Sequence, residues 1–387
     1  MSLALSIQSS VSPTRSEPFL KWPGGKSGEL AKILPAAPSV IGRYFEPFLG
    51  GAAVFLALSH DGRSFLNDKS PDLMAFYRSI ASGDEEFFST LRQMGRDWTE
   101  LQAIVLRHEV QLASLYEEYS QDRLTREEVA STVHNWLSTN AIDFVNLFIS
   151  SSGYAPENFR RELSRNLTGK LNRMKAIEAD RGKLPSEDVI ANIEGALKSA
   201  YYMHIRYLYN QAGSYSIANG LRAAFFFLIR EYAYAAMFRF NSQGHFNVPY
   251  GGITYNRKTM DAKIQRMSAD GTRRKLNAAV LENLDFMDFF QLHTPEPGDF
   301  VFVDPPYDSD FSDYDGSSFG QNDQARLADY LLNHCRANFM VVIKNTDYIS
   351  SLYSDSHLTI HYFDKKYMWT IKERNNRDVT HIMITNY

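Results

Sequence analysis

The feature that most constrains the fold is the order of segments between residues 44 and 67. Tyr44–Phe48 has the apolar and aromatic composition of a strand, and it leads into Gly50-Gly51. Residues 52–58 are typical of a short helix, and residues 63–66 are typical of a second strand. A strand, a glycine turn, a helix and another strand form the opening of a doubly wound sheet. The sequence therefore predicts an α/β fold at this end of the chain.

The strand patterns return near residue 277, after a long interruption. Short apolar runs of the buried-strand type lie at residues 278–283, 300–303 and 339–343. Further strand patterns follow at residues 357–363, 367–371 and 380–385, and residues 321–336 predict an amphipathic helix. Within the interruption, charged and apolar residues recur at helical spacing over residues 85–94, 99–119, 126–147 and 185–209. We expect one sheet that is split in sequence by a mainly helical insert.

These patterns divide the chain into four parts. We expect a flexible N-terminal arm, a first sheet segment, a helical insert and a second sheet segment, at residues 1–17, 18–80, 81–270 and 271–387. The first seventeen residues are rich in serine and have no basic segment ahead of a long apolar one. They are therefore typical of a flexible arm and not of a signal peptide.

Composition limits the remaining classes of protein. With 44% hydrophobic and 22% charged residues, the chain can bury a large core, and we expect two domains. Its most apolar stretch, residues 223–237, is interrupted by Arg230 and Glu231, so we predict no membrane association. A single cysteine, Cys335, excludes an internal disulfide and fits a cytoplasmic protein. The histidines have no metal-site spacing, and we predict no metal.

The net charge of −4 does not by itself indicate a nucleic-acid-binding protein. Any contact with DNA must therefore come from local basic patches. One candidate is the basic run at residues 160–175, where paired acids are absent over much of the span. This slightly favours a phosphate-contacting surface over a merely solvated face.

Asp304-Pro305-Pro306-Tyr307 directly follows the apolar run 300–303. It therefore lies at the carboxyl end of a strand, where open α/β sheets bind their ligands. The two prolines remove backbone donors and leave carbonyl oxygens to accept hydrogen bonds from a substrate amino group. The carboxylate is a further acceptor, and the tyrosine has a flat face that can stack on a base. The tetrapeptide alone fits a site for a planar amine and a simple proline turn about equally well.

Two further motifs concern cofactor and charge. Gly50 and Asp68 have the spacing of a dinucleotide- or adenosyl-binding unit, with the acid placed to hold a ribose diol. Gly25-Lys26-Ser27 is not a phosphate-binding loop, because the pattern requires glycine at Leu20 and a preceding strand. Trp22 offers aromatic contact there, and the two lysines of the motif offer charge. The alternative is a packed tryptophan with two solvated lysines.

The order and spacing of these motifs resemble the Dam family, the D12 class of adenine-N6-specific DNA methyltransferases. The shared motifs are Lys21-Trp22-Pro23-Gly24-Gly25-Lys26, Glu46-Pro47-Phe48-Leu49-Gly50-Gly51, Asn67-Asp68, Arg239 to Gly251, Asp304 to Tyr307, and Arg377 to Asn386. The resemblance covers residues 19–80 and 230–387. It implies a Rossmann-like class I methyltransferase sheet with an inserted, mainly helical DNA-recognition domain. It also implies methylation of adenine N6 in a specific double-stranded DNA sequence, with S-adenosyl-L-methionine as donor and with base flipping.

The resemblance also implies roles for individual residues. The cofactor pocket would be formed by Trp22, Lys26, Glu46, Phe48, Gly50 and Asp68, with Asp285 and Phe286 near the adenine of the cofactor. The flipped target adenine would be held by Asp304, Pro305, Pro306 and Tyr307. The DNA contacts would be Lys21, Tyr234, Arg239 and Asn247, with Tyr234 as a wedge in the base stack. Departures from the family pattern are Ala52 in the glycine turn, Ala235 beside the wedge, and the length of the insert from about Ser82 to Gly220.

Several alternatives stay open at this point. Arg239 can be a structural arginine paired with a carboxylate, Tyr234 a core aromatic, and Asp285 the cap of a turn. Asn247 and Pro249 fit a loop-shaping role as ordinary turn residues. Rival functions are methylation of another planar amine, such as cytosine N4 or a protein glutamine, and a catalytically silent DNA-binding regulator with the same fold. The expected partners are DNA and a cognate restriction or defence protein, for a chain that is a monomer or a weak dimer.

Overall fold

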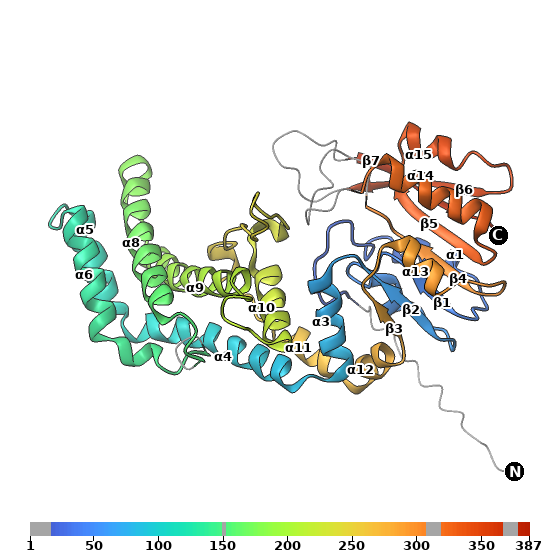
Figure 1. The fold of residues 1–387 in the computed structure, drawn as a ribbon. Helices are drawn as coiled ribbons and strands as arrows, with labels where there is room; N and C mark the ends of the chain where they lie inside the picture. Colours follow the sequence, from blue (N-terminus) through green and yellow to red (C-terminus); the bar gives the residue numbers. More distant parts are fainter. Residues whose placement is uncertain (1–16, 149–151, 307–318, 367–377) are drawn as a thin grey trace, which may run out of the picture.

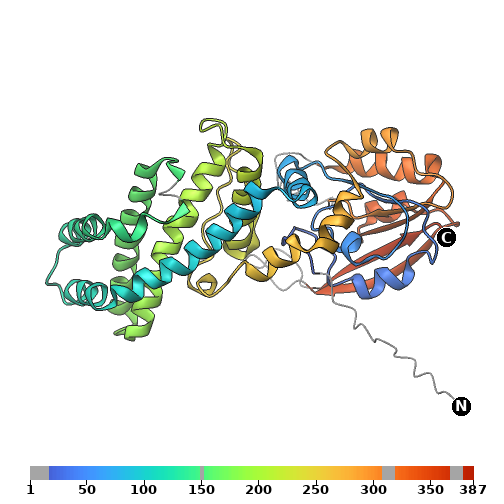
Figure 2. The same ribbon diagram turned by 90° about the horizontal axis from the view of Figure 1, so that it is seen from below.

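The computed structural model of the chain describes residues 17–148, 152–306, 319–366 and 378–387. The sheet and the helices that cover it form one end of the molecule, and other helices project from it as an elongated arm (Figure 1). The view turned by 90° shows the same division (Figure 2). The predicted strand at residues 367–371, Tyr307 and most of the N-terminal arm lie outside the described residues.

A single seven-stranded sheet unites the two ends of the chain, with the order β3-β2-β1-β4-β5-β7-β6. Its strands are β1 Tyr44–Glu46, β2 Ser64–Asn67, β3 Val280–Glu282, β4 Phe300–Val303, β5 Asn338–Lys344, β6 Thr359–Lys366 and β7 Asp378–Thr385. The pairs from β3 to β5 are parallel, and β7 is antiparallel to both neighbours. This confirms the predicted α/β fold and its split in sequence.

The pair β1–β4 joins the first sheet segment to the second, with Tyr44 opposite Phe300. From β1 the chain proceeds outward through β2, and from β4 it proceeds outward in the other direction through β5. The strand order therefore reverses between β1 and β4. Ligands of open α/β sheets bind at such a reversal, beyond the carboxyl ends of the strands. The topology thus fixes where a site is to be sought.

Helices account for most of the other described residues. Those next to the strands in sequence are α1 Leu30–Ala36, α2 Ala53–Ala57, α3 Pro71–Ser82, α13 Phe286–Leu292, α14 Gln321–Asp329 and α15 Asp347–Leu352. Those between β2 and β3 that follow α3 are α4 Glu85–Arg107, α5 Glu109–Ser120, α6 Arg126–Thr139, α8 Pro156–Arg181, α9 Ser186–Asn210, α10 Asn219–Tyr232, α11 Asp261–Ser268 and α12 Asp270–Asn277. Within the described residues, every helix is too short or too polar to cross a bilayer.

The side chains of the central strands alternate between two hydrophobic clusters. Phe300 and Phe302 of β4 pack in a cluster that continues into the helical arm. Val301 and Val303, which point the opposite way, pack in a second cluster with residues of α13, α14 and α15. This alternation follows from the two-residue period of a strand. Both faces of the sheet are therefore buried, as expected for parallel strands.

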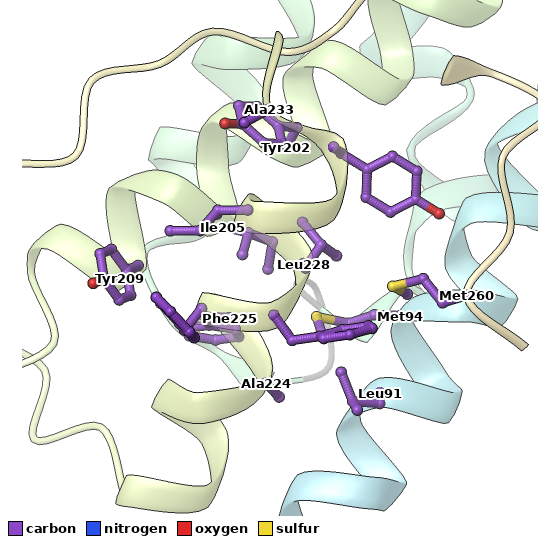
Figure 3. Close-up of a cluster of buried hydrophobic side chains, with 14 of the residues drawn as sticks. Leu91, Met94, Tyr202, Ile205, Tyr209, Ala224, Phe225, Leu228, Ala233 and Met260 are labelled. Carbon is purple, nitrogen blue, oxygen red and sulfur yellow. The ribbon is translucent and has the colours of Figure 1, made fainter. Parts of the chain in front are cut away.

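The core of the arm forms where α4, α9 and α10 meet (Figure 3). Leu91 and Met94 of α4, Ile205 of α9 and Leu228 of α10 all belong to this one cluster of buried side chains. All four side chains are fully buried. The arm and one face of the sheet share a single continuous core, which ties the position of the arm to that of the strands.

Three details differ from the sequence-based expectations. The patterns at residues 85–94 and 99–119 belong to α4, which is continuous to Arg107, and to α5. The helix predicted over residues 321–336 is α-helical only to Asp329 and then continues as a π-turn over Tyr330–His334. Residues 156–181, which are polar and basic in composition, form one long helix, α8. Its apolar residues bury one side of the helix: Phe159, Leu163, Leu167, Leu171 and Met174.

The basic run at residues 160–175, where paired acids are expected to be absent over much of the span, has ion pairs at three of its basic residues. Arg160 pairs with Glu157 one turn earlier, and Arg165 pairs with Glu162 at 3.5 Å. Lys175 pairs with Asp122 at 2.7 Å. Two of the partners, Glu157 and Asp122, precede the run in the chain, so acids inside the run alone do not show the full pairing.

Candidate active site and DNA-facing loop

Three of the predicted carboxylates lie at one edge of the sheet. Glu46 is the last residue of β1, Asp68 directly follows β2, and Asp304 directly follows β4. Because β1 lies between β2 and β4 and runs parallel to both, their carboxyl ends meet at the same edge. The structure thus brings together acids that are far apart in the sequence.

Lys26 contributes the positive charge of this edge. It lies on the loop of residues 19–26, here called the N-terminal loop. Its side chain is 2% exposed and forms an ion pair with Asp304. Its Nζ also donates to the carbonyl of Gly24 at 3.0 Å. The alternative of a solvated lysine is therefore wrong for Lys26. A buried ammonium paired with a carboxylate fixes the position of both side chains.

Glu46 is buried and accepts a hydrogen bond from the Tyr44 hydroxyl at 2.7 Å. Burial, with a smaller contribution from the carboxylates of Asp304 and Asp68, raises the pKa of Glu46 to about 8. The side chain therefore holds a proton at neutral pH in the protein alone. A cation bound near it would favour the ionised form. An edge with this excess of acids over lysine suits a positively charged ligand.

The raised pKa of Glu46 predicts a stability effect with a definite sign. The unfolded chain loses this proton near pH 4.5, whereas the folded protein keeps it to about pH 8. Between these values, each pH unit lowers the free energy of unfolding by at most about 1.4 kcal/mol through this group. We expect Glu46→Gln, which has no proton to lose, to become increasingly more stable than the wild type as the pH rises to about 8.

Urea unfolding at a series of pH values measures this difference. Glu85→Gln is the matched control, because Glu85 is an exposed residue at the start of α4. Its unfolding midpoint should follow that of the wild type throughout. Parallel curves for Glu46→Gln and the wild type would contradict the raised pKa.

The glycine turn after β1 is held by the acid after β2. Gly50 has φ +47°, and its N–H donates to Asp68 Oδ2 at 2.9 Å. The N–H of Ser70 donates to Asp68 Oδ1 at the same distance, and the Tyr77 hydroxyl donates to the Gly50 carbonyl at 2.9 Å. A Cβ at Gly50 would lie 2.9 Å from Cδ1 of Trp22. Glycine is required there, and the indole of the N-terminal loop packs directly on the turn.

Ala52 is the departure from the family pattern in this turn, and the structure gives it a physical meaning. It has φ 56° and ψ 28°, in the left-handed region, and it is fully buried. A left-handed conformation costs a non-glycine residue about 1–2 kcal/mol. Glycine at this position would avoid that strain, although it would lose more entropy on folding.

We therefore expect Ala52→Gly to raise the free energy of unfolding by about 0.5–1 kcal/mol. Urea unfolding of the purified variant measures the change. Ala53→Gly is the control, because Ala53 is the first helical residue of α2 and its replacement should destabilise. A lower midpoint for Ala52→Gly would show that the turn is not strained.

Asp285 and Phe286 stand where β3 leads into α13. Asp285 is the N-cap of α13, accepts from the Met287 N–H at 3.0 Å and pairs with Arg326 at 3.0 Å. The alternative of a capping role is therefore confirmed for Asp285. Phe286 packs against Phe48, with ring centroids 5.5 Å apart, and so joins this corner to the glycine turn. A role of either residue at a cofactor stays a prediction.

The residues after β4 divide into buried and exposed members. The Asp304 side chain is 18% exposed, Pro305 is buried, and Pro306 is exposed. The carbonyl of Pro306 accepts a hydrogen bond from Nε2 of Gln324 at 2.8 Å. Of the two proline carbonyls expected to be open to a substrate, that of Pro306 thus has a partner in the protein. The sequence analysis missed Gln324, which is fully buried on α14.

A second group of predicted residues lies on residues 234–251, here called the recognition loop. Tyr234 is 53% exposed, and its N–H donates to the Pro249 carbonyl at 2.9 Å. Ala235 and Ala236 both have positive φ, so the chain turns sharply just after the tyrosine. The alternative of a core aromatic is therefore wrong for Tyr234. An exposed aromatic ring on a well-anchored turn fits a wedge.

Arg239 and Asn247 face each other across the recognition loop. The Arg239 side chain is exposed, and its Nε donates to Asn247 Oδ1 at 2.8 Å. Within the described ranges, no carboxylate lies within ion-pair distance of Arg239, which disfavours the alternative of a structural ion pair. Asn247 accepts this hydrogen bond and so orients the arginine, in keeping with a loop-shaping role. Lys21 is likewise exposed.

The helical arm holds the recognition loop through one stripe of α9. Tyr202 and Arg206 both donate to the Val248 carbonyl, at 3.0 and 2.9 Å. Asn210 forms two hydrogen bonds with the main chain of Phe246, at 3.0 and 2.9 Å. These three side chains are four residues apart and therefore share a face of the helix. The arm is thus the support of the loop, a function that its sequence pattern did not show.

Comparison with known proteins agrees with this geometry. The family model of the D12 class N6 adenine-specific DNA methyltransferases matches residues 22–150 and 171–369, which includes most of the helical arm. The type II methyltransferase M.CviBI of Paramecium bursaria Chlorella virus NC1A is 25% identical over 96% of this chain and 100% of its own length. The retron Ec67 DNA adenine methylase of Escherichia coli is 25% identical over 94% of this chain and 90% of its own.

A third relative, the type II methyltransferase M1.LlaDCHI of Lactococcus lactis subsp. cremoris, is 22% identical over 96% of this chain and 95% of its own length. The similarity therefore extends beyond the two sheet segments on which the motifs lie. The family match covers well over half of the chain, and it agrees with the sheet order and with the acids at the sheet edge. This chain belongs to the D12 class of N6 adenine-specific DNA methyltransferases, a family of enzymes.

Proposed function

We propose that this enzyme transfers a methyl group from S-adenosyl-L-methionine to N6 of an adenine that is flipped out of a specific double-stranded DNA sequence. The observation that carries the proposal is the charge arrangement at the carboxyl edge of the sheet. There the buried pair Lys26–Asp304 lies beside the protonated Glu46 and the turn-binding Asp68. A buried carboxyl group with a strongly raised pKa, such as that of Glu46, is typical of functional sites.

The residues at this edge fit S-adenosyl-L-methionine in charge and in space. Its sulfonium and ammonium groups are cationic. Asp68 and Asp304 provide carboxylates, and a cation bound beside Glu46 would favour its ionised form. Gly50 has no side chain, which leaves room for the Trp22 indole to pack on the turn and so to border the proposed cofactor site. Asp68, at the end of β2, would hold the ribose, and Phe48 with Phe286 would contact the adenine ring. When bound, the cofactor supplies an electrophilic methyl group, so the reaction needs no metal.

Asp304 is the proposed acceptor for the target amine. The N6 lone pair of adenine is delocalised into the ring, and attack on a methyl group leaves positive charge on that nitrogen. A carboxylate that accepts a hydrogen bond from N6 stabilises this charge most in the transition state. Lys26 orients the Asp304 carboxylate through their ion pair.

The recognition loop is proposed to open the duplex. A base inside the helix cannot reach the sheet edge, and flipping it out costs a few kcal/mol. Tyr234 is exposed on an anchored turn and can fill the gap that the base leaves. Arg239, oriented by Asn247, and Lys21 would contact the DNA beside it. Stacking of the flipped base on Tyr307, outside the described residues, would offset about 1–3 kcal/mol.

The biological setting is also a proposal. Two of the similar proteins are named type II methyltransferases, and a third is named a retron adenine methylase. These names support a cognate restriction or defence protein as a partner. Because the proposed substrate is cellular DNA, we place the enzyme in the cytoplasm, as a monomer or weak dimer.

The decisive experiment expresses the chain in a host without adenine methylation and maps modified bases by long-read sequencing. We expect methylated adenine at one sequence motif, and none with Asp304→Ala expressed to the same level. Absence of modified adenine with the wild type would contradict the proposal. Modified cytosine would favour the rival function, methylation of another planar amine. Cofactor binding without any DNA product would favour the silent regulator.

A further inference from the structure

Arg230 is a buried arginine whose hydrogen bonds end on two different loops. It lies in the last turn of α10, and it is 1% exposed. Its Nη2 donates to the Lys21 carbonyl of the N-terminal loop at 2.5 Å. Its Nη1 donates to the Met237 carbonyl of the recognition loop at 3.0 Å. One guanidinium group therefore links the N-terminal loop, which carries Lys26, to the recognition loop, which carries the proposed wedge Tyr234.

The guanidinium also packs against one aromatic ring from each loop. Its Cζ lies 4.4 Å from the ring centroid of Phe238, in the recognition loop, and 5.4 Å from that of Trp22, in the N-terminal loop. The two rings are themselves 5.1 Å apart. Arg230 thus contacts each loop twice, through a carbonyl and through a ring.

Folding stability alone does not explain an arginine at this position. Its neighbour in sequence, Glu231, pairs instead with Lys258 at 2.9 Å and with Lys263 at 2.5 Å. Burial lowers the pKa of Arg230 to about 10, so the side chain is still charged at neutral pH. Apolar side chains of similar volume usually stabilise a core as well as a buried charge or better. The planar guanidinium has donors that point in two directions, and it holds the two loops in a fixed arrangement.

We propose that Arg230 is a positioning residue that couples DNA contact at the recognition loop to the cofactor side of the active site. The proposal rests on the proposed function. DNA that shifts the turn after Tyr234 shifts the Met237 carbonyl, and the rigid fork transmits this shift to the Lys21 carbonyl and to Trp22. The indole packs on Gly50 of the cofactor turn. Coupling of this kind is reciprocal, so DNA and cofactor tighten each other's binding by the same factor.

The test is the ratio of two dissociation constants for S-adenosylhomocysteine, measured by calorimetry without DNA and with a saturating short duplex. The duplex contains the adenine that the wild type modifies. We expect the wild-type ratio to be about fivefold or more. In Arg230→Met the ratio should fall to within about twofold of one. A merely structural role would change both constants together and leave the ratio intact.

Two further variants make the result specific. Arg222 lies on the same helix and pairs with Asp72 of α3 at 2.8 Å. The variant Arg222→Met should keep the wild-type ratio. Arg230→Lys keeps the charge, but one ammonium cannot replace the fork between two carbonyls, so the ratio should also fall. If Arg230→Met does not fold, as judged by thermal unfolding, Arg230→Lys carries the test.

Three outcomes would overturn the proposal: a wild-type ratio of one, wild-type coupling in the folded Arg230 variants, or equal loss of coupling in Arg222→Met. Failure of the proposed function has a different signature. In that case the wild type binds no S-adenosylhomocysteine, or it modifies no adenine in any DNA.

Discussion

Asp304→Asn is expected to lower kcat by about 10²–10³-fold, the effect of removing one preorganised group that stabilises transition-state charge. The asparagine keeps the shape of the side chain but removes the negative charge that faces the developing positive charge on N6. Affinity for the cofactor should change little, because the glycine turn and Asp68 are untouched. Single-turnover methylation of a duplex and calorimetry with S-adenosylhomocysteine measure the two quantities separately.

Asp304→Ala is expected to abolish methylation as well, but its interpretation is less direct. Lys26 is buried with Asp304 as its ion-pair partner, and removal of one partner of a buried pair destabilises a protein by about 3–5 kcal/mol. The double variant Lys26→Met with Asp304→Asn resolves this. If the lysine acts through the carboxylate, the double variant will be no slower than Asp304→Asn alone. Near-normal turnover of Asp304→Asn would show that the assignment of this residue is wrong.

Asp68→Ala is the second variant with a large expected effect, in this case on cofactor affinity. Its carboxylate accepts backbone hydrogen bonds from Gly50 and Ser70, so its removal both deletes a ligand group and releases the glycine turn. Hydrogen bonds to a charged group contribute about 1.5–3 kcal/mol, which corresponds to a loss of affinity of about 10–100-fold. At saturating cofactor, kcat should recover most of its wild-type value.

Calorimetry with S-adenosylhomocysteine measures this loss. Asp61→Ala is the matched control, because Asp61 is exposed in the turn that precedes β2, at the opposite end of the strand from Asp68. Its affinity should equal that of the wild type. Unchanged binding in Asp68→Ala would overturn the cofactor role of this residue.

The sheet was predictable from the sequence because its signals are local. The run Phe300–Val303 is β4 residue for residue, and the acid that follows it lies at the strand end as predicted. The helix α8 was also within reach, since Phe159, Leu163 and Leu167 repeat every four residues within an otherwise polar segment. The polar and basic composition of the segment conceals that period.

What could not be predicted depends on contacts between distant segments. Nothing near Lys26 indicates burial, because its partner Asp304 is 278 residues away. Tyr234 follows a run of aromatic residues, and only the end of α10 at Tyr232 places it outside the core. The support of the recognition loop by α9 was hidden for the same reason. Its spacing of four residues is visible in sequence, but the main-chain groups that it binds are not.

The way in which α9 holds the recognition loop bears on how such enzymes acquire new targets. The hydrogen bonds of Tyr202, Arg206 and Asn210 to the loop all end on its peptide groups, at Val248 and Phe246. Exchange of exposed loop side chains therefore leaves the anchorage unchanged. In the proposed function, single substitutions there would change base preference and leave the residues of the sheet edge as they are. The side chains that are proposed to contact DNA can therefore change, whereas the hydrogen bonds that hold the recognition loop on α9 stay the same.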